Sequence, residues 1–215
     1  MSPSTPTRTR TRLSPEQRRE SILEAAREVA VSEGLLGLTL KSVGAKAGVA
    51  SSLVAHYFPV MNELVVETFR ALAGDELDSL RVLQLREPSA LSRMRILVDW
   101  LQGAERLDVT ATWLDATLLG RRNETLAAEV RQQLDRWQES VSGLIREGVA
   151  AGEFTCDRPE IVAAHILSLI DGLNTNSLVN YHDAAGLAEY LRELVEAELH
   201  LPRGSLTTAP PHISL

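Results

Sequence analysis

Apolar residues recur along nearly the whole chain at the spacing of three and four residues that is typical of amphipathic helices. The first such stripe consists of Ile22, Ala25, Ala26, Val29 and Ala30. No segment alternates apolar and polar residues as a half-buried strand would, and no motif repeats at a fixed period. The pattern therefore predicts an all-α protein with about nine helices.

Capping residues mark where the first helix begins and ends. Ser14 is a favourable N-cap, Pro15 suits the first helical position, and Gln17 completes a capping box. Gly34 lies beyond the last apolar position of the stripe, where a glycine commonly ends a helix. These residues predict a first helix between Ser14 and Gly34.

Two short helices are expected next. Thr39 suits the N-cap of a helix that ends at Gly48, and a second helix covers roughly residues 51–57. Pro59 ends this second helix because it forces Phe58 out of the α region. A longer helix followed by two short helices around a glycine turn is typical of a helix-turn-helix unit. The second short helix of such a unit can enter the major groove of DNA.

The remaining residues predict a larger helical domain. Its apolar stripes continue to about residue 201, and its helices are expected to begin near Ser89, Asp108, Asn123, a capping box at Asp157–Glu160, and Asp183. The chain is thus divided into a helix-turn-helix domain over residues 14–58 and a second domain over residues 59–201. Residues 1–13 and 202–215 are rich in Ser, Thr and Pro, so we predict a disordered basic arm and a flexible tail.

Composition limits the cellular setting. The single cysteine, Cys156, excludes an intramolecular disulfide and fits a reducing compartment. The arginines near the N-terminus are not followed by an apolar stretch, which argues against a secretory signal. No apolar run approaches the roughly 18 residues that a membrane helix requires. We therefore expect a cytoplasmic protein with no membrane partner.

Charge is divided unevenly along the chain. The net charge is −7, but residues 1–58 hold eight Lys and Arg against five Asp and Glu. Residues 59–215 hold fourteen against twenty-four, so a basic front end is joined to an acidic body. This distribution favours nucleic-acid binding at the N-terminal end, although three of the basic residues belong to the predicted arm.

The segment ILEAAREVAVSEGLLGLTLKSVGAKAGVASSLVAHYF, residues 22–58, resembles the N-terminal domain of TetR-type transcriptional regulators. The matching positions are Ile22-Leu23-Glu24-Ala25-Ala26, Gly34, Thr39, Ala47-Gly48-Val49 and His56-Tyr57-Phe58. The resemblance covers about 45 of the 215 residues, and the helical remainder agrees in length and class. It implies a ligand-responsive DNA-binding regulator, most often a repressor that a small molecule releases from its operator.

The resemblance also implies roles for individual side chains of the helix-turn-helix unit. Phosphate contacts would come from Thr39, Lys41 and Tyr57, and contacts with base edges from Ser51, Ser52 and His56. Three positions depart from the family pattern, because Ala50 replaces a serine cap, Ala55 a frequent tyrosine, and Met61 a phosphate-binding lysine. These departures imply weaker binding, a different operator, or help from the arm residues Arg8, Arg10 and Arg12 in the minor groove.

A homodimer on a palindromic double-stranded operator is the next implication of the resemblance. Such a dimer would place two reading helices about 34–36 Å apart. Small and apolar residues of the last two helices are the candidates for the interface: Ser168, Gly172, Thr175, Leu187, Tyr190, Leu191 and Leu194. The same residues could instead belong to the core of a single chain.

For a ligand pocket we consider tryptophans and polar residues on otherwise apolar helices. The candidates are Trp100, Trp113, Trp137, His165 and Asn174. They predict a largely apolar cavity with few polar anchors. An aromatic cavity could hold a cation, but no residue singles this out. Asp171 is assigned to the dimer seam or to a packing defect rather than to the pocket.

Other functions have little support in the sequence. There is no glycine-rich phosphate loop after a strand, no His-Glu-x-x-His and no Gly-x-Ser-x-Gly motif, and the histidines are scattered. We therefore expect neither catalysis, nor a metal site, nor a cofactor. The alternative that remains is a helical protein-interaction module with a degenerate helix-turn-helix.

Overall fold

The computed structural model describes residues 13–103, 106–181 and 184–207, and this part of the chain is all-α, as predicted. Its elements are α1 (Pro15–Glu33), the 3₁₀-helix η1 (Leu35–Gly37), α2 (Leu40–Ala47), α3 (Ser51–Tyr57), α4 (Met61–Gln84), α5 (Ala90–Leu101), α6 (Leu107–Gly120), α7 (Glu124–Ala150), α8 (Pro159–Ser177) and α9 (Ala184–Glu198). Most of the predicted arm and the last eight residues of the predicted tail lie outside the described residues.

The predicted N-terminal caps are confirmed. The Ser14 hydroxyl accepts a hydrogen bond from the backbone N–H of Gln17 at 3.2 Å, and the Gln17 side chain accepts from the Ser14 N–H at 2.9 Å. Thr39 caps α2 by a reciprocal pair of bonds with Ser42. Gly48 follows α2 with a φ of 65°, in the left-handed region that favours glycine, and so turns the chain into α3.

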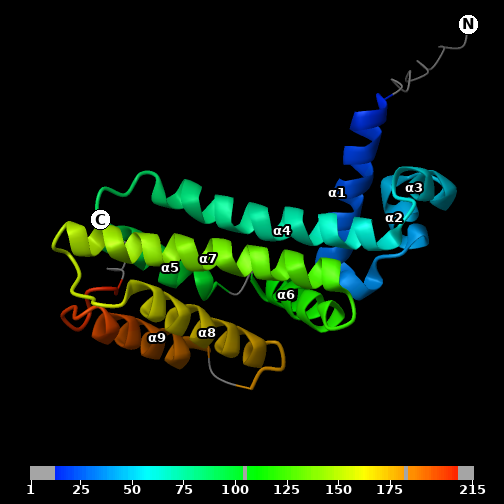
Figure 1. Ribbon diagram of the computed structural model, residues 1–215. Coiled ribbons are helices and arrows are strands. Elements are labelled where there is room, and N and C mark those ends of the chain that lie inside the picture. The colour runs from blue at the N-terminus through cyan, green and yellow to red at the C-terminus, as the bar shows by residue number, and fades with distance from the viewer. Residues whose placement is uncertain (1–12, 104–105, 182–183, 208–215) are drawn as a thin grey trace, which may run out of the picture.

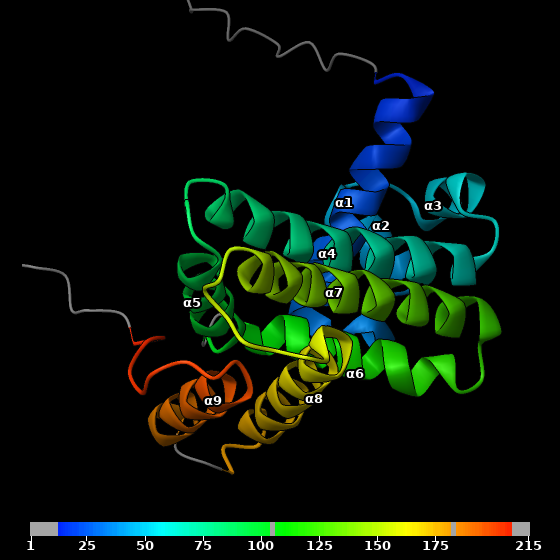
Figure 2. The same ribbon diagram turned by 60° about the vertical axis from the view of Figure 1, so that its left-hand side comes forward.

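Two apolar clusters hold the helices together. The first lies beneath α1, α2 and α3 and extends onto the beginnings of α4 and α7. The second joins the end of α4 to α5, α7, α8 and α9. Helices α4 and α7 lie side by side in both views, and α4 contributes to both clusters, so it connects the N-terminal unit with the body (Figures 1 and 2). Trp113 on α6 packs against both clusters.

The capping prediction for the body is only partly correct. Ser89 and Asn123 cap α5 and α7 as expected. The capping box predicted at Asp157–Glu160 is wrong, because Arg158 is the N-cap of α8 and makes no side-chain capping bond. Glu160 instead pairs with Arg146 of α7 at 2.6 Å, a contact between helices that a local pattern does not reveal.

The flexible tail predicted from residue 202 begins too early. Leu206 is buried, and the backbone N–H groups of Gly204 and Leu206 donate to the buried Glu196 carboxylate at 2.9 and 2.7 Å. Arg95 on α5 donates to the Ser205 carbonyl at 2.6 Å. The prediction is therefore wrong for residues 202–207. The buried side chain of Leu206 and the buried carboxylate of Glu196 hold this segment in place despite its polar composition.

None of the helices in the described part of the chain combines the length and the apolarity that crossing a bilayer requires.

Candidate functional site

The α2–α3 unit lies at one end of the molecule (Figure 1). It presents short polar side chains to solvent. Val43 of α2 and Val54 of α3 are fully buried and fix the two helices against α1. On the opposite face of α3, Ser51, Ser52 and His56 are exposed. This arrangement leaves the side chains expected to meet base edges free of protein contacts that would cover them.

The side chains expected to contact phosphates differ in their exposure and in the contacts they already make. Lys41 is exposed. Thr39 is exposed too, but its hydroxyl accepts the N–H of Ser42 at 2.9 Å and so also caps α2. Tyr57 is half-buried, and its ring packs edge-on against His56 with 5.3 Å between the ring centroids. The arm residues Arg8, Arg10 and Arg12 lie outside the described residues.

Gly44 is a packing position between α2 and α3 that the sequence pattern did not reveal. A Cβ atom at this residue would lie 3.0 Å from the Val49 carbonyl oxygen and 3.2 Å from the Ser51 nitrogen. Glycine thus allows the backbone at the start of α3 to pack directly on α2. A glycine within a helix of eight residues was the signal that could have identified this contact.

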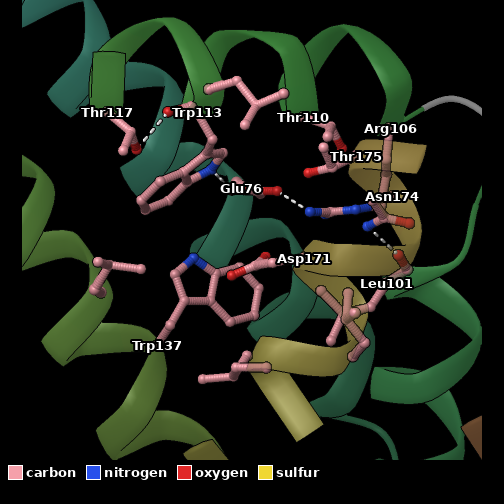
Figure 3. Close-up of a pocket in the computed structure, with 14 residues that line it drawn as sticks. Glu76, Leu101, Arg106, Thr110, Trp113, Thr117, Trp137, Asp171, Asn174 and Thr175 are labelled. Carbon is pink, nitrogen blue, oxygen red and sulfur yellow. Dashed lines mark hydrogen bonds and ion pairs between the residues drawn. The ribbon is translucent and has the colours of Figure 1, made fainter. Parts of the chain in front are cut away.

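A cavity of about 200 Å³ lies between α4, α6, α7 and α8, and Leu101 at the end of α5 also lines it (Figure 3). Two tryptophans form its aromatic walls. Trp113 of α6 donates its indole N–H to Glu76 at 2.9 Å and packs edge-on against Phe69. Trp137 of α7 is buried and stacks on Trp100 of α5, with 6.0 Å between the ring centroids.

A buried ion pair also lines the cavity. Glu76 of α4 accepts the Trp113 N–H with one carboxylate oxygen and pairs with Arg106 through the other. The Arg106 guanidinium lies over the Trp100 ring, 4.1 Å from the centroid. The charges of Glu76 and Arg106 therefore compensate each other, and both groups are held in place.

Asp171 of α8 supplies a carboxylate that is not compensated in this way. Figure 3 shows it pointing into the cavity between Trp113 and Trp137. It has no hydrogen-bond partner among the described residues. Although part of its side chain remains open to solvent, burial raises its pKa above the usual range; the charge of Glu76 raises it further, while Arg106 opposes the shift. The cavity thus carries one net negative charge when Asp171 is ionised.

The structure brings three of the predicted pocket residues together. Trp113, Trp137 and Asn174 line the cavity. Trp100 stands behind Trp137 and supports that wall.

His165 does not line this cavity, so that part of the prediction needs correction. It is exposed, and its Nδ1 atom lies 3.2 Å from a Glu198 carboxylate oxygen on α9. The reason is helical register. Leu167 lines the cavity, and a separation of two residues turns a side chain about 200° around the helix.

Two residues assigned to the dimer seam line the cavity instead. Asp171 and Thr175 of α8 both face it, four and eight residues after Leu167. Glu76, within the apolar stripe of α4, was missed altogether. Two signals were available in the sequence: a carboxylate in the middle of an apolar stripe, and polar residues at helical spacing. Neither signal indicates which neighbouring helix that side of α4 or α8 packs against.

The other candidates for the dimer interface differ in their solvent exposure. Ser168 and Gly172 of α8 are exposed, and Tyr190 of α9 is 55% exposed. Leu194 is half-buried, and the side chain of Leu187 lies outside the described residues. Leu191 is fully buried in the second cluster, so its assignment to an interface is corrected: its face of α9 packs inward.

The cavity and the helix-turn-helix unit are joined through α6. Asp115, two residues after Trp113, accepts the backbone N–H of Leu35 at 2.9 Å. Leu35 begins η1, which connects α1 with α2. The same helix therefore carries Trp113, which lines the cavity, and Asp115, which binds the N-terminal unit.

Two family models match the chain. Residues 22–68 match the model described as bacterial regulatory proteins, tetR family. Residues 92–200, about half of the chain, match the model described as BetI-type transcriptional repressor, C-terminal. The chain belongs to the TetR family. It is a ligand-responsive transcriptional repressor of the BetI type that binds DNA, and not an enzyme.

Relatives agree with this assignment. The BetI regulator of Rhizobium meliloti is 27% identical over 73% of this chain and 75% of its own length. The uncharacterised regulator YfiR of Bacillus subtilis is 28% identical over 85% of this chain and 94% of its own. A solved regulator from Saccharomonospora viridis, in complex with choline, covers 84% of this chain and 96% of its own with a TM-score of 0.75 and 21% identity. The predicted family and fold are thus confirmed.

Proposed function

We propose that this TetR-family repressor binds a palindromic operator as a homodimer and leaves it when a small quaternary ammonium compound, choline, occupies the cavity. One observation carries the proposal: the unpaired carboxylate of Asp171 points into a cavity walled by Trp113 and Trp137. A DNA-bound role also leads us to propose a cytoplasmic location.

The chemistry of the cavity suits a cation that has no N–H group. A quaternary ammonium cannot donate conventional hydrogen bonds, so it is recognised by aromatic faces and by a nearby negative charge. Trp113 and Trp137 supply the faces, and Asp171 supplies the charge. Because Glu76 and Arg106 compensate each other, a ligand with a single positive charge would bring the cavity to neutrality.

Choline enters the proposal from a solved structure of the same fold. The Saccharomonospora viridis regulator was crystallised with it. At 21% identity this likeness establishes the fold and not the ligand. The argument for choline in this chain is therefore the match between its single charge and the aromatic and acidic lining of the cavity.

For DNA binding we propose contacts of Ser51, Ser52 and His56 with base edges, and contacts of Thr39, Lys41 and Tyr57 with phosphates. Their exposure on the α2–α3 unit supports these roles, with Tyr57 the most enclosed.

The dimer would form through α8 and α9. These helices lie at an outer edge of the body in both views, and Ser168, Gly172 and Tyr190 are exposed there (Figures 1 and 2). Gly172 has no atom within 4 Å of the position of a Cβ, so a partner helix could approach closely. Two-fold symmetry would then set two α3 helices on successive major grooves.

Effector action is proposed as a shift between two arrangements of the dimer. Choline would favour the arrangement that fits the operator less well, and the shift is limited by the difference in its affinity for the two. The bond from Asp115 to Leu35 would carry the change from α6 to the reading unit.

The proposal is tested by fluorescence anisotropy of a labelled duplex from upstream of the protein's own gene. Choline is expected to weaken binding of this duplex in proportion to its occupancy of the cavity. The control is the uncharged carbon isostere of choline, in which a quaternary carbon replaces the nitrogen. Equal release by the isostere, or no release by choline, would contradict the proposal.

A further inference from the structure

Two neighbouring arginines lie in the turn between α6 and α7. Arg121 is the C-cap of α6, and Arg122 lies between it and Asn123, the N-cap of α7. Both arginine side chains are exposed, and neither has an ion pair or a side-chain hydrogen bond within the part of the chain that the structure describes. The turn therefore presents two positive charges to solvent that no described residue compensates.

The turn is held against the beginning of α4. The side-chain amide of Asn123 donates a hydrogen bond to the side chain of Asn62, which follows the last residue of α3 by five residues. The backbone N–H of Asn123 donates to the Gly120 carbonyl at 3.1 Å and closes the turn. Leu126, in the first turn of α7, is fully buried in the apolar cluster beneath α1, α2 and α3. The two arginines are thus attached firmly to the DNA-reading end of the chain.

The position of the turn brings positive charge to that end. In both views the connection between α6 and α7 lies at the same end of the molecule as α3 (Figures 1 and 2). The beginning of α4, which lies between them along the contact just described, supplies no cation, because residues 60–63 are Val, Met, Asn and Glu. Glu63 is exposed there and carries the opposite charge. A positive surface beside α3 on this side therefore depends on Arg121 and Arg122.

Other charged side chains around the turn and the α2–α3 unit have partners within the chain. Glu124, the first residue of α7, pairs with Arg131 at 2.6 Å. Lys46 of α2 pairs with Glu28 of α1 at 2.7 Å. The charge of the acidic residue closest in sequence to the turn is thus compensated elsewhere, and the two arginines of the turn are available to an anion from outside the chain.

We propose that the α6–α7 turn is part of the DNA-binding surface, where Arg121 and Arg122 contact phosphates beside the groove that α3 enters. The proposal rests on the docking of α3 in the major groove under the proposed function, and it adds a contact from the body of the protein. A DNA duplex carries about one negative charge per 1.7 Å of its axis, so a duplex bound at this end offers phosphates as the anions. The planar guanidinium suits them because it can donate two parallel hydrogen bonds to one phosphate group.

A purely structural role is the alternative. The carbonyl end of a helix favours nearby cations, and Arg121 caps that end of α6. This role predicts that loss of the arginines lowers the unfolding temperature and leaves the salt dependence of DNA binding unchanged. A phosphate contact predicts the reverse, because counterions are released from the DNA only where a cation of the protein replaces them.

The test combines Arg121→Gln with Arg122→Gln in the full-length protein. Anisotropy titrations over a range of salt use a duplex from upstream of the protein's own gene and an unrelated duplex of equal length. We expect affinity at about 0.1 M salt to fall at least about tenfold, and the slope of log affinity against log salt to become less steep by about two for each bound subunit. The ratio of the affinities for the two duplexes should stay as in the parent, because phosphate contacts carry no sequence information.

Two further double variants serve as controls. Arg86→Gln with Arg158→Gln removes the same charge from exposed arginines that also lack a side-chain partner among the described residues. They lie in the α4–α5 and α7–α8 connections, at the end opposite α3, so this control should keep the slope of the parent (Figure 1). Arg121→Lys with Arg122→Lys retains both charges and should keep most of the slope and of the affinity.

Lys41→Ala separates failure of the inference from failure of the function on which it rests. If Lys41→Ala makes the slope less steep but the glutamine variant of the turn does not, the inference alone is overturned. An equal change in the Arg86 and Arg158 control would also overturn it, since the effect would then follow net charge. A lower unfolding temperature with an unchanged slope would assign Arg121 and Arg122 to the structural role. No change of slope in either Lys41→Ala or the turn variant would overturn the proposed docking of α3 and the inference together.

Discussion

At the scale of single residues, Asp171 shows how a proposed binding group can oppose stability. Its carboxylate has no hydrogen-bond partner among the described residues, and burial raises its pKa. Because the folded protein then holds the proton more tightly than the unfolded chain, the free energy of unfolding is lowered as pH rises from the ordinary carboxyl range to the raised pKa. The same ionised group is the one that would attract a cation.

Asp171→Asn is therefore expected to change binding and stability in opposite directions. Choline affinity should fall about tenfold to hundredfold, because one partner of a charged interaction is lost. The ligand-free variant should melt at a higher temperature near neutral pH, since an uncompensated charge is removed. Calorimetric titration and thermal unfolding check the two effects. A variant that binds choline as well as the parent does would remove Asp171 from the site.

Acidification provides a second test of this residue. As pH falls through the raised pKa of Asp171, the carboxylate is neutralised and choline affinity should decline. In Asp171→Asn the affinity should stay level across the same range of pH. Choline titrations of both proteins in a series of buffers measure this. A decline of equal size in the variant would assign the pH dependence to another group.

At the scale of elements, Gly44 determines how closely α2 and α3 pack. In Gly44→Ala the new Cβ would meet backbone atoms of Val49 and Ser51 at 3.0 and 3.2 Å, and backbone cannot move aside as a flexible side chain can. We expect a loss of about 1–3 kcal/mol in the free energy of unfolding. We also expect operator affinity to fall by a larger factor than choline affinity. The proposed choline site lies between α4, α6, α7 and α8, so choline binding should persist.

Gly143→Ala is the control for this prediction. The nearest atom that its Cβ would meet is the Arg146 guanidinium, at 3.8 Å, and alanine favours the interior of α7 by up to about 1 kcal/mol. Chemical unfolding and operator binding are measured for both variants. Unimpaired operator binding by Gly44→Ala would show that the close packing of α2 and α3 is dispensable.

The elements also show what a sequence can reveal. The caps at Ser14, Thr39 and Asn123 were predictable because a capping bond spans only three residues. The pairing of Glu160 with Arg146 was not, because it joins two helices. In the cavity, the tryptophans could be nominated from size alone. The inward face of Asp171 and the burial of Leu191 depend on which helix packs against which, and helical periodicity does not specify that.

At the scale of the whole molecule, the number of lysine–phosphate contacts indicates how many subunits bind the operator. The only lysines in the chain are Lys41 and Lys46. If Lys41 contacts a phosphate in each subunit of a homodimer, Lys41→Ala should make the slope of log affinity against log salt less steep by about two. Lys46→Ala should change the slope less, because Lys46 pairs with Glu28 at 2.7 Å. Anisotropy titrations over a range of salt concentrations measure both slopes. A change of about one would point to a single bound subunit, and no change to a Lys41 that does not contact phosphate.

The proposed communication between the cavity and the DNA would be a property of the assembled molecule, and Asp115 offers a way to test it. Its carboxylate accepts the N–H of Leu35, so Asp115→Ala should disconnect α6 from η1 while leaving the cavity lining in place. We expect choline affinity to change by no more than about twofold, whereas the weakening of operator binding by saturating choline should shrink by at least about fivefold. Asp135→Ala on α7 removes the same charge at an exposed position and should preserve the coupling. Operator titrations with and without choline give the coupling for each protein. If Asp115→Ala responds to choline as fully as the parent does, the signal travels by another route, such as the packing of Trp113 against Phe69.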